Sequence, residues 1–244
     1  MIEARDAAAR VEHAAKHYGE GDTRVAALDD VSLAFERGRF NAIMGPSGSG
    51  KSTLLHCLAG LDLLTSGSAF IGDVRLGDLS ERELTLLRRE KVGFVFQAFN
   101  LIPTLDASEN ITLPVSIAGR TADTDWYDTV VSTMRLGDRL SHRPSELSGG
   151  QQQRVAAARA LVSRPEIIFA DEPSGNLDSK SGDELLGFMR KAVDEFGQTI
   201  VMVTHDPHAA AFADRVVFLA DGRSAGEIED PTTDRILEFQ KRMG

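Results

Sequence analysis

Residues 45–52 read Gly45-Pro46-Ser47-Gly48-Ser49-Gly50-Lys51-Ser52 and match the phosphate-binding pattern G-x-x-x-x-G-K-S/T at every fixed position. The apolar run Phe40–Met44 precedes them directly, and Lys51–Leu58 has a helical composition. A strand, a glycine-rich loop and a helix in this order can turn successive backbone N–H groups toward one phosphate. The stretch therefore predicts a site for ATP or GTP that is contacted by the loop and by Thr53.

Two residues of this stretch carry the chemistry of such a site. We expect the ammonium group of Lys51 to reach the β- and γ-phosphates and the hydroxyl of Ser52 to coordinate Mg²⁺. A structural Gly/Ser turn before a helix is the simpler alternative, and the complete match in its strand-loop-helix context argues against it. The loop by itself does not distinguish a kinase, a GTPase, a helicase and a transport motor.

The composition predicts one globular domain over residues 1–244, with 42% hydrophobic and 26% charged residues. No run approaches the roughly 20 apolar residues that cross a bilayer, and residues 1–10 lack the apolar segment of a signal peptide. The net charge of −10 argues against a nucleic-acid partner. The single cysteine, Cys57, excludes an internal disulfide and reads as a small helix residue. A local basic patch has these candidates: Lys16, Arg24, Arg88, Arg89 and Lys91.

Apolar runs alternate with helical patterns along most of the chain. The runs lie at 40–44, 92–96, 167–170, 200–204 and 216–219, and the helical patterns at 51–58, 151–162 and 183–195. This order predicts an α/β fold with a mostly parallel sheet covered on both faces.

Two other regions depart from that pattern. The stretch 98–146 has helix-like segments at 106–115 and 123–134 without a strand run, which predicts an inserted helical subdomain at about 98–155. The stretch 10–35 alternates short β-like pieces around a turn at 19–22, which predicts an antiparallel edge.

An acidic pair, Asp171-Glu172, follows the apolar run 167–170. The strand would deliver both carboxylates to the edge of the sheet where α/β proteins bind ligands. Asp171 is suited to hold Mg²⁺ through water, and Glu172 to polarise the attacking water as a general base. A solvated strand end or a helix cap is the alternative, which the phosphate loop makes less favourable.

A second Ser/Gly-rich loop opens the helix at 151–162, and reads Leu147-Ser148-Gly149-Gly150-Gln151-Gln152-Gln153-Arg154. A helix cap would explain Ser148 but not the whole octet. With the phosphate loop and the acidic pair, these residues resemble the ATP-binding cassette (ABC) family. The resemblance implies a P-loop NTPase cassette with a RecA-like parallel-sheet core, an N-terminal antiparallel β subdomain and an inserted α-helical subdomain.

The family's remaining motifs follow in order, so the resemblance covers essentially the whole chain. It implies that Tyr18 stacks on adenine, Gln97 belongs to a Q-loop that meets Mg²⁺ and the attacking water, and His205 contacts the γ-phosphate. Asp178 would belong to the D-loop at 174–178, on the nucleotide side. Each residue alone has a plainer explanation, such as packing for a tyrosine or a structural hydrogen bond for a histidine.

The resemblance also implies partners. Two cassettes would pair head-to-tail, so that Ser148, Gly149, Gly150 and Gln151 complete the partner's ATP site. Lys51, Ser52, Gln97, Asp171, Glu172 and His205 would serve the chain's own nucleotide. A membrane permease would dock beside Gln97, on the cytoplasmic face of the cell membrane.

The stretches 93–105 and 171–178 look like the lipoprotein-release and macrolide-export branch of the family. Because no fused membrane domain follows, the resemblance implies a separately encoded permease. The departures are His17 before Tyr18, the extra amide in Gln152-Gln153, and a first ten residues without a motif. None of these departures changes a residue assigned to ATP hydrolysis, so an active ATPase is expected.

Two alternative functions would use the same kind of ATPase domain. One is a soluble ABC ATPase of translation or DNA repair, which normally has tandem cassettes or a long coiled-coil insertion, and neither is visible here. The other is a module that regulates an extracytoplasmic process, such as cell-wall hydrolysis, without moving a substrate. The sequence does not identify a cargo, because in this architecture the permease holds the transport site.

Overall fold

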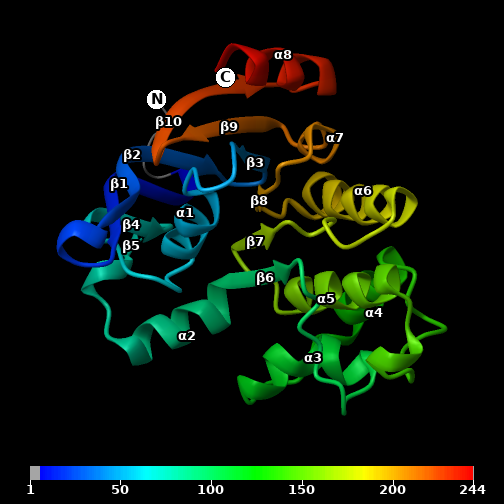
Figure 1. The fold of residues 1–244 in the computed structure, drawn as a ribbon. Coiled ribbons are helices and arrows are strands. Elements are labelled where there is room, and N and C mark those ends of the chain that lie inside the picture. Colours follow the sequence, from blue (N-terminus) through cyan, green and yellow to red (C-terminus); the bar gives the residue numbers. More distant parts are fainter. Residues whose placement is uncertain (1–5, 244) are drawn as a thin grey trace.

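The computed structural model describes residues 6–243, and within them the chain forms two β-sheets with covering helices (Figure 1). The larger sheet has the strand order β10-β9-β3-β8-β7-β6, and the smaller one β2-β1-β4-β5. The strands of the larger sheet are β3 (Phe40–Met44), β6 (Val92–Phe96), β7 (Ile167–Asp171), β8 (Ile200–Val203), β9 (Arg215–Ala220) and β10 (Arg223–Glu229). Those of the smaller sheet are β1 (Ala7–Tyr18), β2 (Val25–Glu36), β4 (Ser66–Ile71) and β5 (Val74–Arg75).

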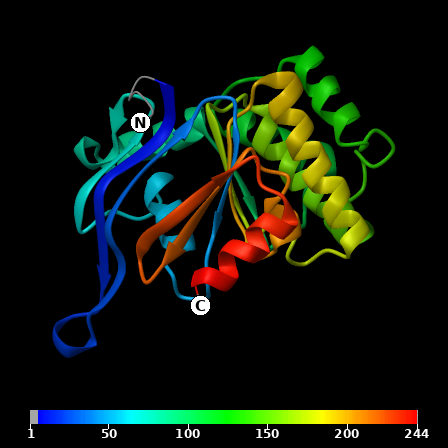
Figure 2. The same ribbon diagram turned by 90° about the horizontal axis from the view of Figure 1, so that it is seen from above.

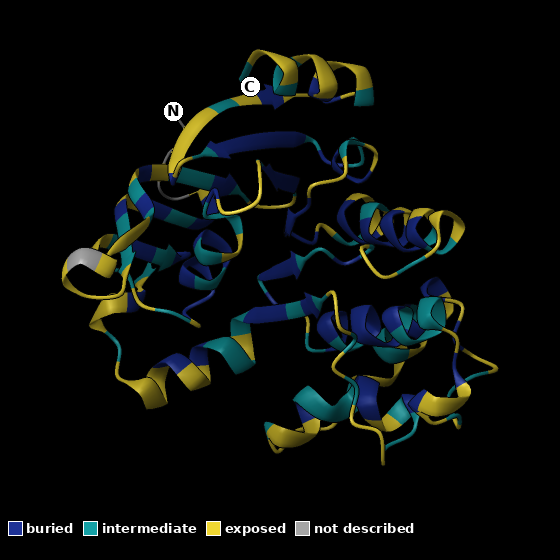
Figure 3. Ribbon diagram, in the orientation of Figure 1, coloured by how far each residue is buried: buried dark blue, intermediate teal, exposed yellow. Residues whose placement is uncertain are grey.

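The larger sheet is parallel except at its β9-β10 edge, which confirms the mostly parallel sheet that the sequence predicted. Because successive strand residues point to opposite faces, β3 contributes Phe40 and Met44 to one core and Ile43 to the other. The central strands of this sheet are buried, whereas its edge strand β10 and the helix that follows it, Thr233–Met243, are largely exposed (Figure 3). This explains why the central strands read as continuous apolar runs and β10 does not.

Helices cover the two faces of this sheet differently (Figure 2). One face carries α1 (Lys51–Leu58), α2 (Glu81–Lys91) and the smaller sheet. The other carries the core shared by α3 (Ala107–Ile117), α4 (Thr124–Thr133), α5 (Gly149–Val162), α6 (Ser179–Phe196), α7 (Pro207–Ala210) and α8 (Thr233–Met243). Short 3-10 turns lie at Gly21–Thr23, Leu76–Asp78 and Pro144–Glu146. Within residues 6–243, no helix is both long and apolar enough to cross a membrane.

The antiparallel sheet begins earlier than the sequence predicted. Strand β1 starts at Ala7 and pairs with both β2 and β4, so residues 7–10 are structural rather than an extension without a role. Residues 1–5 of that expected extension lie outside the described residues. The prediction missed these residues because small alanines at 7–9 give little β signal, although all three are buried.

Three helices follow β6 before the chain returns as β7, in the region expected to be helical. Asp106, Asp123 and Ser148 cap α3, α4 and α5 by accepting a bond from a backbone N–H three residues on. Helix α5 ends at Val162, as the helical pattern at 151–162 predicted, and its apolar side packs on the large sheet. The subdomain limits and the single domain over 1–244 stay predictions.

Sequence reasoning missed α2 and α8. Helix α2 buries only Leu84 and Leu87, too few to produce a clear helical period. Its start was nevertheless readable, because Ser80 and Glu83 form a capping box.

The basic patch and the cysteine have local explanations. Lys16 pairs with Asp62 at 2.6 Å and Lys91 with Glu166 at 2.7 Å, while Arg88 donates to the Gly60 carbonyl. These side chains are therefore held by neighbours rather than gathered for a ligand. Cys57 is 1% exposed in α1, and burial raises the pKa of its thiol to about 12, which fits an unreactive packing residue.

Candidate active site

Four neighbouring parallel strands bring the predicted catalytic groups to one edge of the large sheet. In the order β3-β8-β7-β6, the chain continues past the carboxyl ends into the phosphate loop, His205, Glu172 and Gln97. This is the edge at which open α/β sheets bind ligands. Topology thus gathers residues that are up to 160 positions apart in the sequence.

The phosphate loop connects β3 to α1 and requires glycine at two places. Gly50 has φ +96°, and a Cβ there would lie 2.2 Å from the Ala27 carbonyl oxygen. Gly45 has φ +151°, and its Cβ would lie 2.1 Å from the Leu219 carbonyl oxygen. Both the left-handed backbone and the close approach exclude a side chain, so the loop can curl at the start of α1.

Lys51 folds back over this loop. Its Nζ donates to the carbonyl oxygens of Gly45 at 2.9 Å and Pro46 at 2.8 Å. Burial lowers the pKa of Lys51, and the nearby carboxylates of Glu172 and Asp171 oppose that shift. The ammonium group is placed where phosphate oxygens could replace the two carbonyls. A cavity of about 510 Å³ adjoins the loop and is lined in part by Pro46, Ser47 and His205.

Ser52 and Asp171 meet across the two elements that carry them. The Ser52 hydroxyl, in the first turn of α1, donates to Asp171 Oδ1 at 3.2 Å. A hydroxyl and a carboxylate supply the oxygen ligands that Mg²⁺ prefers, and Mg²⁺ commonly takes few protein ligands beside substrate phosphates. The two side chains therefore fit the predicted metal site.

Glu172 and His205 form a hydrogen-bonded pair, with His205 Nδ1 2.7 Å from Glu172 Oε1. Glu172 has φ +47°, a left-handed conformation that costs a non-glycine residue about 1–3 kcal/mol. Its backbone N–H is held by the Val203 carbonyl of β8 at 2.9 Å. The neighbouring strand thus fixes an unfavourable backbone turn that directs the Glu172 side chain toward His205.

Gln97 lies against the D-loop rather than the predicted metal ligands. Its Nε2 donates to Asn176 Oδ1 at 3.1 Å, and Asn176 Nδ2 donates to the Gln97 carbonyl at 3.0 Å. Within residues 6–243, no hydrogen bond joins Gln97 to Ser52 or Asp171. The structure therefore gathers Lys51, Ser52, Asp171, Glu172 and His205 but leaves Gln97 beside this group.

Asp178 caps α6 by accepting from the Ser181 backbone N–H at 3.0 Å and the Ser181 hydroxyl at 2.7 Å. The hydroxyl bond is the main reason that the pKa of Asp178 is lowered. Its visible contacts are those of a helix cap, so a role toward the nucleotide stays a prediction.

The second glycine loop is the N-terminus of α5. The Ser148 hydroxyl accepts from the Gln151 backbone N–H, while Gln151 Oε1 accepts from the Ser148 N–H at 2.8 Å. Gly149 and Gly150 form the first turn, and a Cβ on Gly150 would lie 2.9 Å from Ser181 Oγ. Helix α5 lies apart from the phosphate loop in both views of the fold (Figures 1 and 2). The two loops are therefore not parts of one pocket within this chain.

Tyr18 ends β1 and is 44% exposed. Its hydroxyl donates to Asp62 Oδ2 at 2.7 Å and lies next to Thr53, the residue after Ser52. An exposed aromatic ring beside the helix that follows the phosphate loop is well placed for a nucleobase.

Sequence reasoning gave no separate role to Gln153, which is fully buried. Its Nε2 donates to the carbonyls of Phe96 at 2.9 Å and Pro173 at 2.6 Å. Helix α5 is thereby joined to the residue before Gln97 and the residue after Glu172. The only signal was a polar residue among the apolar positions of the helix.

A family model described as ABC transporter matches residues 28–175, more than half of the chain. The chain belongs to the ABC transporter family. The predicted family and cassette fold are confirmed, and the cassette binds and hydrolyses ATP as expected.

Its relatives fit the predicted macrolide-export-like branch. The macrolide export ATP-binding/permease protein MacB of Bdellovibrio bacteriovorus is 47% identical over 207 residues, which cover 85% of this chain and 32% of that protein. The chain thus spans about a third of the length of that relative. An ABC transporter ATP-binding protein of Methanocaldococcus jannaschii, MJ0796, is 43% identical over 87% of this chain and 93% of its own length.

Solved cassettes share the fold. The dimeric post-hydrolysis structure of MJ0796 bound to ADP and Pi has a TM-score of 0.82 at 42% identity, and covers 92% of this chain and 99% of that one. The cbiO1 protein of Clostridium perfringens, part of the ABC transporter complex cbiONQ, has a TM-score of 0.83 at 25% identity, covering 97% and 93%.

Proposed function

We propose that this cassette powers export or mechanical work by a separately encoded membrane permease, working as a head-to-tail dimer at the cytoplasmic face of the membrane. The observation that carries the dimer is the separation of the two glycine loops, each a helix N-terminus suited to an anion. A second copy would bring its α5 loop to the phosphate loop of the first. MJ0796, at 42% identity, is described as a dimeric cassette.

The side chains at the sheet edge then have distinct roles. Lys51 and the loop N–H groups bind the phosphates, and Glu172 accepts the proton of the attacking water while His205 orients Glu172. Ser52 and Asp171 would hold Mg²⁺, which supplies charge neutralisation at the phosphate oxygens when bound. Gln97 would reach this site only after leaving Asn176.

A mixed dimer tests the shared site. Lys51→Ala removes a phosphate ligand, whereas Gly149→Asp puts a carboxylate at the start of α5, where it is compatible with the helix but repels phosphate. Each variant alone should be inactive. A one-to-one mixture should recover about a quarter of the wild-type ATPase activity, because half of the dimers are mixed and each has one intact site. Full activity of Gly149→Asp alone, or an inactive mixture in which mixed dimers form, would argue against the shared site.

Co-purification tests the membrane partner. The tagged chain, expressed in its own host, should sediment with membranes and, after detergent extraction, carry an integral membrane protein that changes its ATPase rate. Lys51→Ala serves as the control for hydrolysis, since it should retain the partner. Recovery of the chain on ribosomes without a membrane protein would instead favour the soluble alternative.

A further inference from the structure

A hydrogen-bonded network next to α1, the helix that follows the phosphate loop, joins Lys16, Asp62 and Tyr18. Lys16 Nζ donates to Asp62 Oδ1 at 2.6 Å and to the Leu63 carbonyl at 2.7 Å. Tyr18 donates to the other carboxylate oxygen of Asp62, Oδ2, at 2.7 Å. Each carboxylate oxygen of Asp62 therefore accepts a hydrogen bond from a side chain of β1.

Lys16 also lies over the Tyr18 ring. Its Nζ is 4.9 Å from the ring centroid, within the range of a cation–π contact. The Lys16 side chain is only 13% exposed, whereas Tyr18 is 44% exposed. The ammonium group engages one ring face, and the exposure of Tyr18 leaves ring surface that a flat ligand could contact.

The charges of Lys16 and Asp62 stabilise each other. Burial would raise the pKa of Asp62, but the bonds from Lys16 and Tyr18 outweigh burial and lower it. Burial likewise opposes the charge on Lys16, and Asp62 outweighs burial and raises that pKa. Both groups stay ionised near neutral pH.

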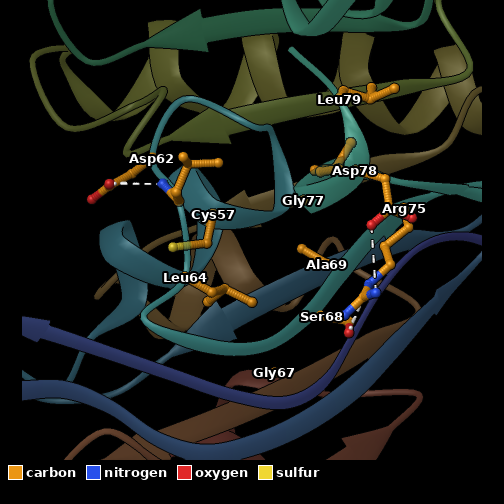
Figure 4. Close-up of a pocket in the computed structure, with 12 residues that line it drawn as sticks. Cys57, Asp62, Leu64, Gly67, Ser68, Ala69, Arg75, Gly77, Asp78 and Leu79 are labelled. Carbon is orange, nitrogen blue, oxygen red and sulfur yellow. Dashed lines mark hydrogen bonds and ion pairs between the residues drawn. The ribbon is translucent and has the colours of Figure 1, made fainter. Parts of the chain in front are cut away.

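Asp62 depends on this network for its position. It follows the end of α1 and lines a cavity of about 430 Å³ together with Cys57 (Figure 4). In that view its carboxylate is turned away from Ser68 and Arg75 on the other side of the cavity. A side chain beside a cavity lacks packing on that face, so its bonds to Leu63, Lys16 and Tyr18 define its orientation.

We propose that Lys16 and Asp62 are positioning residues that hold the Tyr18 ring for stacking on the nucleobase, and thereby set the affinity for the base-containing part of the nucleotide. The ring ends a strand and precedes a turn, so without the bond to Asp62 it would be held less firmly, and more of its ordering would have to occur on binding. The inference rests on the predicted stacking of Tyr18 on the nucleobase, for which the exposed ring would be the base platform.

The test compares ADP with pyrophosphate, because pyrophosphate reaches the phosphate loop but has no base. Asp62→Asn and Lys16→Met keep the side-chain size and remove the charge. Each should raise the Kd for ADP by roughly five- to tenfold, and leave the Kd for pyrophosphate within about twofold, measured by calorimetry. Arg10→Met is the matched control, because Arg10 lies in β1 like Lys16 and its guanidinium is 3.7 Å from the ring of Phe70 in β4. This variant should change neither Kd.

The outcomes separate the two levels of the proposal. If Tyr18→Ala raises the Kd for ADP but Asp62→Asn and Lys16→Met do not, the positioning role is wrong and the base platform stands. If Tyr18→Ala leaves the Kd ratio of ADP to pyrophosphate unchanged, the base platform itself is wrong. An equal loss for both ligands in Asp62→Asn and Lys16→Met overturns the positioning role, since it indicates general damage to the loop.

Discussion

Glu172→Gln is expected to lower the rate of ATP hydrolysis by about 10²–10⁴-fold, because an amide cannot accept the proton of the attacking water. The variant keeps the size of the side chain and can still hydrogen-bond His205, which lies 2.7 Å from it. ATP binding should survive, since the change leaves Lys51 and the loop, which are proposed to bind the phosphates, untouched. The ATP-bound dimer should therefore accumulate, which light scattering with ATP would show alongside a steady-state phosphate-release assay.

Glu195→Gln is the matched control for this change. Glu195 lies in α6 and pairs with Lys191 at 3.6 Å, so its replacement removes an exposed carboxylate without touching the sheet edge. Its hydrolysis rate should equal that of the wild type. Unchanged turnover in Glu172→Gln would contradict the general-base assignment, whatever the state of the dimer.

Lys51→Ala is expected to weaken ATP binding by roughly 100-fold, because it removes the ammonium group that donates into the phosphate loop. Lys51 makes two bonds in the loop, to the carbonyl oxygens of Gly45 and Pro46, so these carbonyls also lose their donor. The fold should persist, since these groups can be solvated at the open edge. Calorimetric titration with ATP measures the loss, and the thermal unfolding midpoint checks the fold.

Lys191→Ala removes a lysine of α6 whose side chain is 46% exposed, and should bind ATP like the wild type. Tight ATP binding by Lys51→Ala at unchanged ionic strength would refute the role assigned to Lys51. Loss of binding together with loss of the fold would instead show that Lys51 stabilises the loop itself.

Much of the fold could be predicted from the sequence, because the motifs and apolar runs that indicate it are local. The phosphate pattern requires a strand before it and a helix after it, and buried parallel strands read as apolar runs. The missed elements are those with weak local patterns. Residues 7–9 are small, α2 buries two leucines, and β10 and α8 lie at an exposed edge.

The sequence also predicted most of the site residues, because each comes at or after the end of a recognisable apolar run. These residues are Lys51, Ser52, Asp171, Glu172 and His205. The structure places these residues at one edge, while their roles in catalysis stay proposals. Gln97 shows the limit of a motif. Its family pattern predicted a contact with Mg²⁺, but in this structure its amide is bound by Asn176.

The amino-acid sequence by itself determined the family, the ATP site and the strand-loop-helix unit that builds it, because phosphate binding needs particular residue types at adjacent positions. Tertiary structure alone decided which distant side chains meet: Glu172 with His205, Gln153 with Phe96 and Pro173, and Asp62 with Lys16 and Tyr18. These contacts depend on strand order and on where loops end, and neither leaves a period or a spacing in the chain. The separation of the phosphate loop from the α5 loop is of the same kind, and the proposal of two half-sites rests on it.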